Sequence, residues 1–166
     1  MDRPERKALR LPDYDYSRAG AYFVTICTEK RRCAFGTIRR GDPCGRPPTE
    51  LTLYGKIAEE MLRRVEDLYA VRFDHYVIMP NHVHLLCRVE DRRATARVAP
   101  TLGRIIGAYK SLTANGCREA GLPFSLWQRG FYEHVIRDSA DYLRIWSYID
   151  SNPFKWEEDQ YYSAGS

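Results

Sequence analysis

The sequence predicts an α+β protein built as a ferredoxin-like sandwich: an antiparallel sheet with two helices on one face, plus a C-terminal helix. Three observations predict this fold. The chain has 166 residues, the length of one domain with its own core. Its apolar fraction of 44% is ordinary for a globular protein. Apolar periodicity then gives the order strand, helix, strand, strand, helix, strand, which is the order of this sandwich.

The first half of the chain supplies one strand and one helix. Residues 1–19 are polar, lack a packing period and are predicted to form a flexible arm. Residues 21–28 are apolar on both faces, as expected of a central strand. The basic residues 29–40 and the Gly/Pro-rich residues 41–48 are expected to be a solvated loop, with phosphate binding as the alternative. Apolar residues at helical spacing predict the first helix over 53–69.

The second half of the chain supplies the remaining elements. Strands are predicted at 73–79, 82–89 and 124–137, and helices at 101–117 and 138–152. Pro80 and Asn81 provide turn chemistry between the first two of these strands, which indicates an antiparallel hairpin. The last helix ends before Pro153 and has no place in a two-layer sandwich. We therefore expect it beside or across the sheet.

Two of the four histidines lie in the second strand of that hairpin. His82 and His84 are separated by one residue, so their side chains share one face of the strand, about 6 to 7 Å apart. Val83 and Leu85 alternate with them and assign the other face to the core. We expect the imidazoles on the sheet face that the two helices leave free, where they can converge on one metal ion. The alternative is that they are ordinary surface or core histidines.

The last helix carries a tyrosine outside its apolar stripe. That stripe consists of Tyr142, Trp146 and Ile149, flanked by Leu143 and Ile145. At 100° per residue, Tyr148 lies about 130° from the centre of the stripe and Asn152 about 90° from it. The two are four residues apart and so share a face of the helix. The alternative for Tyr148 is an ordinary exposed tyrosine.

Three ordered motifs, MPNHVH, WQxxFYEHVIR and DYxxxxxYIxxNP, resemble the REP-associated tyrosine transposases of bacteria, within the single-tyrosine HUH transposase superfamily. The resemblance covers about residues 22–156. It implies that His82 and His84 are metal ligands, that Tyr148 is the catalytic tyrosine and that Asn152 completes the metal site. Gln128 and His134 belong to the middle motif, and both are candidates for a place behind the metal ligands. For His134 we expect packing, and the alternative is a role behind the metal ligands or in proton transfer.

The resemblance implies a metal-dependent single-stranded DNA endonuclease and strand transferase that acts on REP-type hairpin DNA through a covalent 5′-phosphotyrosine intermediate. Nitrogen and oxygen ligands together admit Mg²⁺ or Mn²⁺, with Zn²⁺ as the alternative. Two other functions stay open: a non-catalytic single-stranded nucleic-acid-binding module, and a metal-dependent hydrolase that uses water. The expected division of the chain is an arm at 1–19, the HUH tyrosine transposase domain at 20–156 and a tail at 157–166.

Basic side chains are the expected means of holding DNA. The net charge of +4 permits a polyanionic partner without identifying one. The candidates, each with a solvated surface role as the alternative, are Lys30, Arg31, Arg32, Arg39, Arg40, Arg104 and Lys110. Five cysteines without a C-x-x-C pair, and no apolar leader or long apolar run, predict a cytoplasmic protein that does not span a membrane. The sequence leaves open whether the protein is a monomer or a homodimer.

Overall fold

The computed structural model describes residues 20–39, 49–90 and 101–163. Its elements in chain order are β1 (Gly20–Cys27), the 3-10 helix η1 (Glu29–Arg31), β2 (Gly36–Ile38), β3 (Thr49–Leu51), α1 (Leu53–Leu68), β4 (Val71–Ile78), β5 (His82–Val89), α2 (Leu102–Glu119), β6 (Tyr132–Ile136), α3 (Ser139–Ser151) and the 3-10 helix η2 (Pro153–Glu158). The expected arm at 1–19, Arg40, the 41–48 loop and residues 164–166 of the tail lie outside the described residues.

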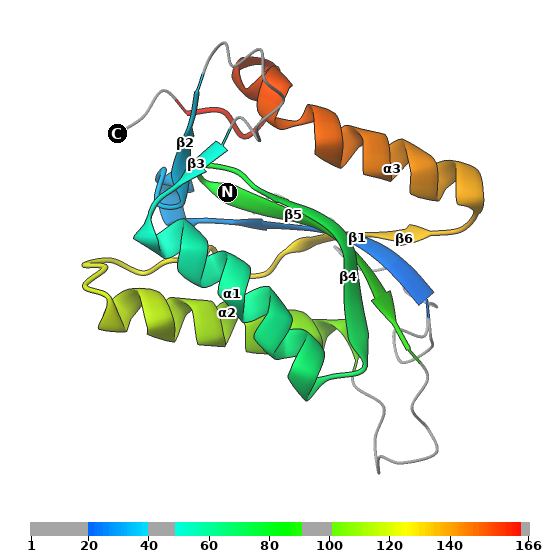
Figure 1. Ribbon diagram of the computed structural model, residues 1–166, viewed down its shortest axis with the longest axis horizontal. Helices are drawn as coiled ribbons and strands as arrows, with labels where there is room; N and C mark the ends of the chain where they lie inside the picture. The colour runs from blue at the N-terminus through cyan, green and yellow to red at the C-terminus, as the bar shows by residue number, and fades with distance from the viewer. Residues whose placement is uncertain (1–19, 40–48, 91–100, 164–166) are drawn as a thin grey trace, which may run out of the picture.

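Four strands form the main sheet in the order β4-β5-β1-β6, and every neighbouring pair is antiparallel. Together with α1 and α2, these strands give the βαββαβ arrangement of a ferredoxin-like sandwich. Figure 1 shows α1 and α2 on one side of the sheet and α3 on the other. The predicted fold is confirmed.

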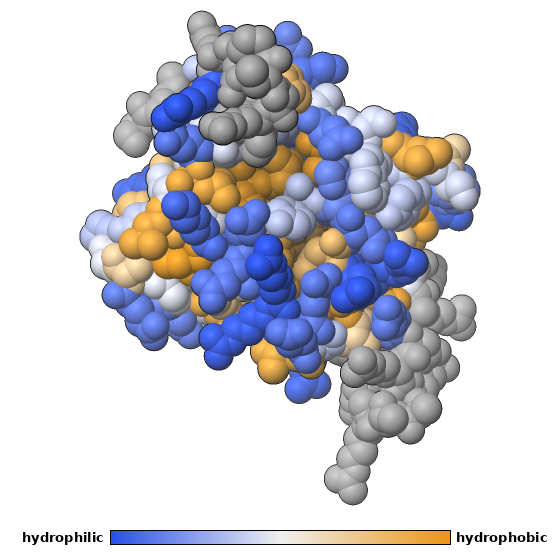
Figure 2. Space-filling model, in the orientation of Figure 1, coloured by the Kyte–Doolittle hydropathy of each residue, from blue (hydrophilic) through white to orange (hydrophobic). Residues whose placement is uncertain are grey.

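The face toward α1 and α2 buries the main apolar core. Val24, Val83 and Leu85 point into it and are fully buried. The two helices are joined there by the Tyr109 hydroxyl, which donates to the Ala58 carbonyl oxygen at 3.1 Å. The face of the molecule shown in Figure 2 mixes mainly hydrophilic side chains with hydrophobic patches. The side chains between the sheet and the two helices therefore form the main hydrophobic core.

The opposite face is covered by α3, which lies across the sheet, one of the two placements expected for this helix. Ile145 and Ile149 of α3 pack against Phe23 of β1 and Leu86 of β5. The reason is that both partners present apolar side chains, which are more stable when buried against each other than when exposed. Leu143, expected to flank the apolar stripe, instead points away and is 64% exposed.

Two further segments differ from the sequence-based expectation. The last strand spans only 132–136, because residues before it follow an irregular path through Gly130, whose φ of +78° favours glycine. Trp127 lies on that path and donates its indole N–H to the Lys110 carbonyl oxygen at 3.1 Å. Within residues 29–40, expected to be a loop, the structure forms the strand β2, which pairs with β3 as a two-stranded ribbon. Among the described residues, no helix combines the length and apolar character that crossing a bilayer requires.

Candidate active site

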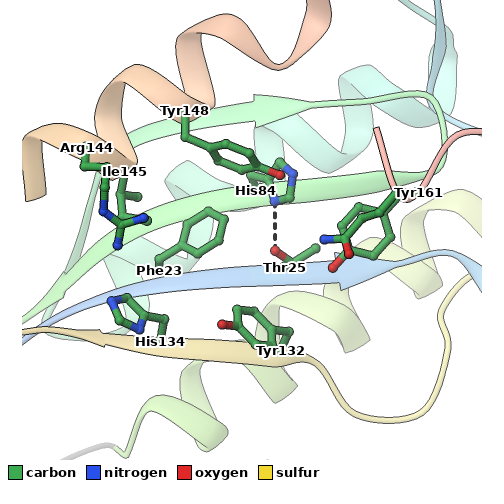
Figure 3. A pocket seen from close by; sticks show the side chains of 10 residues that line it. Phe23, Thr25, His84, Tyr132, His134, Arg144, Ile145, Tyr148 and Tyr161 are labelled. Atoms are coloured by element: carbon green, nitrogen blue, oxygen red, sulfur yellow. Dashed lines mark hydrogen bonds between the residues drawn. The ribbon is translucent and has the colours of Figure 1, made fainter. Parts of the chain in front are cut away.

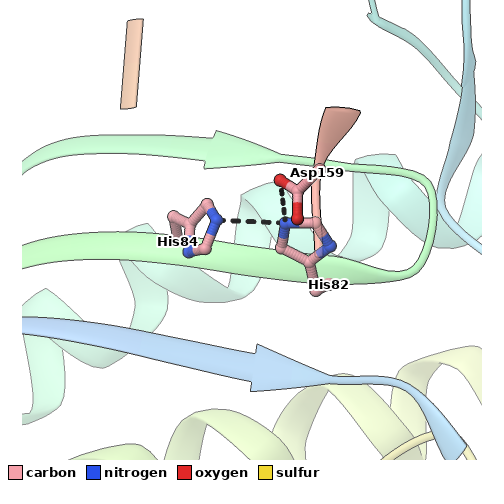
Figure 4. Close-up of side chains that lie close together, drawn as sticks. All are labelled: His82, His84 and Asp159. Atoms are coloured by element: carbon pink, nitrogen blue, oxygen red, sulfur yellow. Dashed lines mark hydrogen bonds and ion pairs between the residues drawn. The ribbon is translucent and has the colours of Figure 1, made fainter. Parts of the chain in front are cut away.

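The alternation of β5 places His82 and His84 on the side of the sheet that faces α3. Thr25 of β1 pairs with His84, and Cys27 with His82. The prediction that the two imidazoles lie on the face away from α1 and α2 is confirmed, but both are buried, with 0% and 1% exposure. Their rings tilt toward each other, and the two Nε2 atoms are 3.1 Å apart. The protein thus aims both nitrogens at a common point (Figure 4).

The other nitrogen of each ring is bonded to a buried polar side chain. His84 Nδ1 lies 2.8 Å from Thr25 Oγ1, and His82 Nδ1 lies 2.9 Å from Asn81 Oδ1. Burial lowers the pKa of His82 to about 3, despite an opposing interaction with the Asn152 side chain. Burial also lowers the pKa of His84 well below its usual value. At neutral pH both rings are neutral, which is the form that binds metal ions.

Asp159 is a potential metal ligand that the sequence analysis missed. Its Oδ2 lies 3.9 Å from His82 Nε2, and one ligand atom from each of His82, His84 and Asp159 lies within 4.8 Å of the others. Atoms bound to one ion at about 2.0 to 2.1 Å are separated by about 3 to 4 Å. The 3.1 Å between the two Nε2 atoms and the 3.9 Å from His82 Nε2 to Asp159 Oδ2 fit that range. Asp159 follows η2 in a segment with no apolar period, so no local pattern marked it.

Asn152 reaches the same cluster from the C-terminal end of α3. It is 4% exposed, and its Nδ2 donates to Asp159 Oδ2 at 2.8 Å. Its Oδ1 is buried and has no hydrogen-bond partner among the described residues. A buried oxygen without a donor is costly, and a cation would compensate that cost. Among the observations on this cluster, this buried oxygen without a donor gives the strongest support for a bound metal ion.

Tyr148 lies directly over the histidines in the same chain. Its ring centroid is 5.3 Å from that of His84 and 5.8 Å from that of Phe23. Figure 3 shows its hydroxyl pointing toward His84. Burial, and then the negative charge of Asp159, raise the pKa of Tyr148, so its phenol is protonated at neutral pH. The structure therefore brings tyrosine and imidazoles together without a second subunit.

A second tyrosine that the sequence analysis missed also touches the imidazoles. The ring of Tyr161 lies 4.7 Å from that of His82 and 6.0 Å from that of His84. Burial raises the pKa of Tyr161 to about 12. Unlike Tyr148, it stands in a segment without helix or strand. Tyr161 is therefore a second tyrosine, besides Tyr148, to be tested as the nucleophile at this site.

Cavities lie on both sides of Tyr148. The larger one, about 460 Å³, runs from Tyr148 and His84 to His134 and Arg144, and Tyr132 forms part of its wall (Figure 3). The other one, about 320 Å³, is lined by polar residues that include Asn152, Lys155 and Asp159. Tyr148 thus stands between two solvent-accessible hollows.

His134 lies in the wall of the larger cavity rather than against the two histidines. Its Nε2 is 2.7 Å from Asp141 Oδ2, and the other oxygen of that carboxylate accepts a hydrogen bond from Arg144. Asp141 therefore holds an imidazole and a guanidinium together at the end of the cavity that lies away from His84 (Figure 3).

The basic residues of η1 lie near this site. Arg31 donates to the Gln160 carbonyl oxygen at 2.6 Å, and its guanidinium lies 5.2 Å from the centroid of the Tyr161 ring. Lys30 is exposed beside it. The guanidinium of Arg32 lies 4.5 Å from the centroid of the Phe124 ring. The structure brings Arg31 to the edge of the site.

The remaining described candidates lie elsewhere. Arg39 pairs with Glu50 on the β2–β3 ribbon at 2.6 Å. Lys110 of α2 donates to the carbonyl oxygens of Gln128 and Gly130, each at 2.7 Å. Arg104 is exposed on α2, on the other side of the sheet. Gln128 is tied to the end of β1 through its backbone N–H, which donates to the Cys27 carbonyl oxygen at 2.9 Å.

Comparisons with known proteins found similar sequences and a similar fold. No protein-family model matches the chain. An uncharacterised protein of Haemophilus influenzae is 33% identical over 95% of this chain and 93% of its own length. A second Haemophilus influenzae protein, whose name assigns it to the REP-associated tyrosine transposases, is 26% identical over 85% of this chain and 74% of its own length.

A solved structure supports the same assignment at the level of the fold. It is that of a REP-associated tyrosine transposase bound to a REP hairpin, which matches with a TM-score of 0.64 and 20% identity over 88% of this chain and 73% of that chain. Sequence motifs, the named relative and the fold point to one group of proteins. The chain is therefore similar to the REP-associated tyrosine transposases in its motifs, in the relative that carries that name and in its fold.

Proposed function

We propose that this protein is a metal-dependent single-stranded DNA endonuclease and strand transferase that acts on REP-type hairpin DNA through a covalent 5′-phosphotyrosine intermediate. The observation that carries the proposal is the contact between Tyr148 and His84, whose ring centroids are 5.3 Å apart beside the paired His82 and His84 nitrogens. A phenol and an imidazole pair at one point have the groups that phosphoryl transfer to tyrosine requires.

His82, His84 and the buried Oδ1 of Asn152 would hold the ion, with Asp159 as a further oxygen ligand. Two imidazole nitrogens and these oxygens suit Mg²⁺ or Mn²⁺. When bound there, such an ion supplies positive charge to the oxygens of a phosphoryl group.

Tyr148 would act as the nucleophile. Its phenolic oxygen forms a bond to the phosphorus, the bond from phosphorus to the 3′ oxygen breaks, and the proton lost by the phenol balances the proton gained by the leaving 3′-OH. The raised pKa of Tyr148 means that the phenol needs a proton acceptor during attack. Because the new phosphotyrosine bond keeps the energy of a phosphoester, another 3′-OH can attack it and join strands without ATP.

The substrate would be a single strand, since Tyr148 must reach a phosphate that base pairing does not shield. The larger cavity offers an exposed aromatic ring, Tyr132, and a guanidinium, Arg144. Stacking surfaces and cations of this kind hold single-stranded nucleic acids. The REP hairpin bound by the solved relative makes hairpin DNA the first substrate to test.

The test is incubation of the protein with a hairpin oligonucleotide, labelled at its 3′ end and carrying single-stranded flanks, in Mn²⁺, followed by denaturing electrophoresis. We expect a labelled protein–DNA adduct that survives denaturation. Release of cleaved DNA without an adduct would instead support the hydrolase, and intact DNA would support the non-catalytic binder.

Matched variants identify the nucleophile, because three tyrosines line the larger cavity: Tyr132, Tyr148 and Tyr161. Tyr148→Phe should abolish the adduct while leaving Mn²⁺ affinity unchanged. Tyr132→Phe and Tyr161→Phe should each retain the adduct. An adduct that persists in Tyr148→Phe and disappears in Tyr161→Phe would reassign the nucleophile.

A further inference from the structure

Asn81 and Thr25 are fully buried side chains that touch the two imidazoles from behind, and nothing in the proposed chemistry yet uses them. We infer that they control the proton positions on the ring nitrogens: Asn81 holds His82 in one tautomer, and Thr25 allows His84 to change tautomer when a divalent cation binds. The inference rests on the proposed metal site and assigns two positioning residues to it.

The hydrogen bonds of the Asn81 side chain allow only one orientation of its amide group. Its Nδ2 donates to the carbonyl oxygens of Arg31, at 3.1 Å, and Tyr161, at 2.9 Å, and these oxygens can only accept. Its Oδ1 is therefore the atom that faces His82 Nδ1, and a carbonyl oxygen also only accepts. It follows that His82 carries its proton on Nδ1 and leaves Nε2 bare.

His84 must then carry its proton on the other nitrogen in the absence of a cation. The two Nε2 atoms are 3.1 Å apart, a hydrogen-bond distance at which two bare nitrogens would repel each other. Since His82 Nε2 has no hydrogen, His84 Nε2–H has to be the donor. Its Nδ1 is then bare and accepts from the Thr25 hydroxyl, 2.8 Å away.

A cation bound to both Nε2 atoms requires the opposite arrangement on His84. Its Nε2 must become bare, so its proton has to be on Nδ1, facing Thr25. A hydroxyl can donate or accept, so Thr25 Oγ1 satisfies Nδ1 in both states by rotating its hydrogen. An amide oxygen such as that of Asn81 could not serve both states. Asn81, which only accepts, thus suits the histidine that keeps its tautomer, His82. Thr25, which donates or accepts, suits the histidine that changes tautomer, His84.

Nuclear magnetic resonance of histidine-labelled protein tests the inference, because ring nitrogen shifts report which nitrogen carries the proton. In the metal-free protein we expect the Nδ1–H form for His82 and the Nε2–H form for His84. Saturation with Mg²⁺, which is diamagnetic, should convert His84 to the Nδ1–H form and leave His82 unchanged. A metal-free His82 in the Nε2–H form, or a His84 that keeps its tautomer while Mg²⁺ binds, would overturn the inference.

Substitutions at Thr25 separate positioning from packing. Thr25→Val keeps the shape but loses the hydroxyl, and loss of a group that orients a metal-binding histidine lowers metal affinity about 10- to 100-fold. Thr25→Ser keeps the hydroxyl and should restore both the Mn²⁺ affinity, measured by calorimetry, and the change of tautomer. Equal Mn²⁺ affinities of Thr25→Val and wild type would remove Thr25 from this role.

These measurements remain informative if the proposed nuclease activity fails. The tautomers of the metal-free protein do not depend on DNA cleavage, and metal affinity is read without a substrate. Loss of adduct formation together with the expected tautomers would therefore refute the proposed function and keep the assignment of Asn81 and Thr25.

Discussion

The two faces of the central sheet bury different kinds of side chain from the same strand. On one face β5 buries Val83 and Leu85 against α1 and α2, where packing is apolar. On the other it buries His82 and His84 beneath Tyr148, Trp156 and Tyr161. Burial on the first face stabilises the fold directly, because apolar surface leaves water. On the second it costs free energy unless each polar atom finds a partner.

That difference shows that the residues that stabilise the fold and the residues of the candidate site lie on opposite faces of the sheet. The polar contacts of the histidines involve or adjoin Thr25, Asn81, Asn152 and Asp159. The buried Asn152 Oδ1 has no hydrogen-bond partner in the part of the chain that the structure describes. Since side chains alternate along a strand, neighbouring residues of β5 should affect different measurements.

The strongest test of this difference between the two faces is a pair of substitutions at adjacent residues, His84→Ala and Leu85→Ala. His84→Ala removes one of two imidazoles and should lower Mn²⁺ affinity and adduct formation more than about 100-fold, since each ligand contributes strongly to a metal site. Leu85→Ala removes a fully buried side chain from the core face and should lower the free energy of unfolding by about 2 to 5 kcal/mol. The measurements are calorimetry with Mn²⁺ and urea denaturation. Comparable metal affinities in the two variants would contradict the separation.

Acid should destabilise the metal-free protein through the histidine face. Burial lowers the pKa of both His82 and His84 below the unfolded value of about 6.5, so the unfolded chain binds more protons below that pH. The stability that these groups contribute is complete above about pH 6.5 and falls as pH drops toward about 3, by up to about 1.4 kcal/mol per pH unit for each imidazole. Urea denaturation in EDTA at several pH values measures the slope.

The control for this slope is the double variant His82→Gln, His84→Gln, which cannot take up those protons. Its free energy of unfolding should depend less steeply on pH over the same range. A slope equal to that of the wild type would mean that other groups cause the acid sensitivity.

A smaller effect is expected from the carboxylate of the cluster. Asp159→Ala should lower Mn²⁺ affinity about tenfold, because one oxygen ligand and its charge are lost. Glu158, its exposed neighbour at the end of η2, is the matched control, and Glu158→Ala should bind Mn²⁺ as the wild type does. Unchanged affinity in Asp159→Ala would assign the third ligand to Asn152 alone.

The smallest expected effects concern single cations on the two sides of the sheet. Arg31→Ala, beside the site, should weaken binding of single-stranded DNA by about three- to tenfold, whereas Arg104→Ala, on α2, should change it less than about twofold. Fluorescence anisotropy at moderate salt measures both affinities. A larger loss for Arg104→Ala would place the DNA on the α1 and α2 side.

Periodicity predicted most of this architecture because it reports which face of an element is buried. The alternation of β5 predicted that both histidines lie on one face of the sheet. The four-residue spacing of Tyr148 and Asn152 predicted that these two lie on one face of the helix. Asp159, Tyr161 and Thr25 join the site only through the tertiary fold, and none has a local signal. The sequence left two placements open for α3, beside or across the sheet, because no local pattern marked Leu86 as its packing partner.

One measurement tests the central claim most directly: mass spectrometry of the trypsin-digested protein–DNA adduct. Cleavage after lysine and arginine separates the tyrosines around the site, because the peptide 145–155 contains Tyr148 alone, 130–137 contains Tyr132, and 156–166 contains Tyr161 and Tyr162. We predict that the DNA is attached to peptide 145–155. Attachment to either of the other peptides would contradict the assignment of Tyr148 as the nucleophile above the His82 and His84 pair.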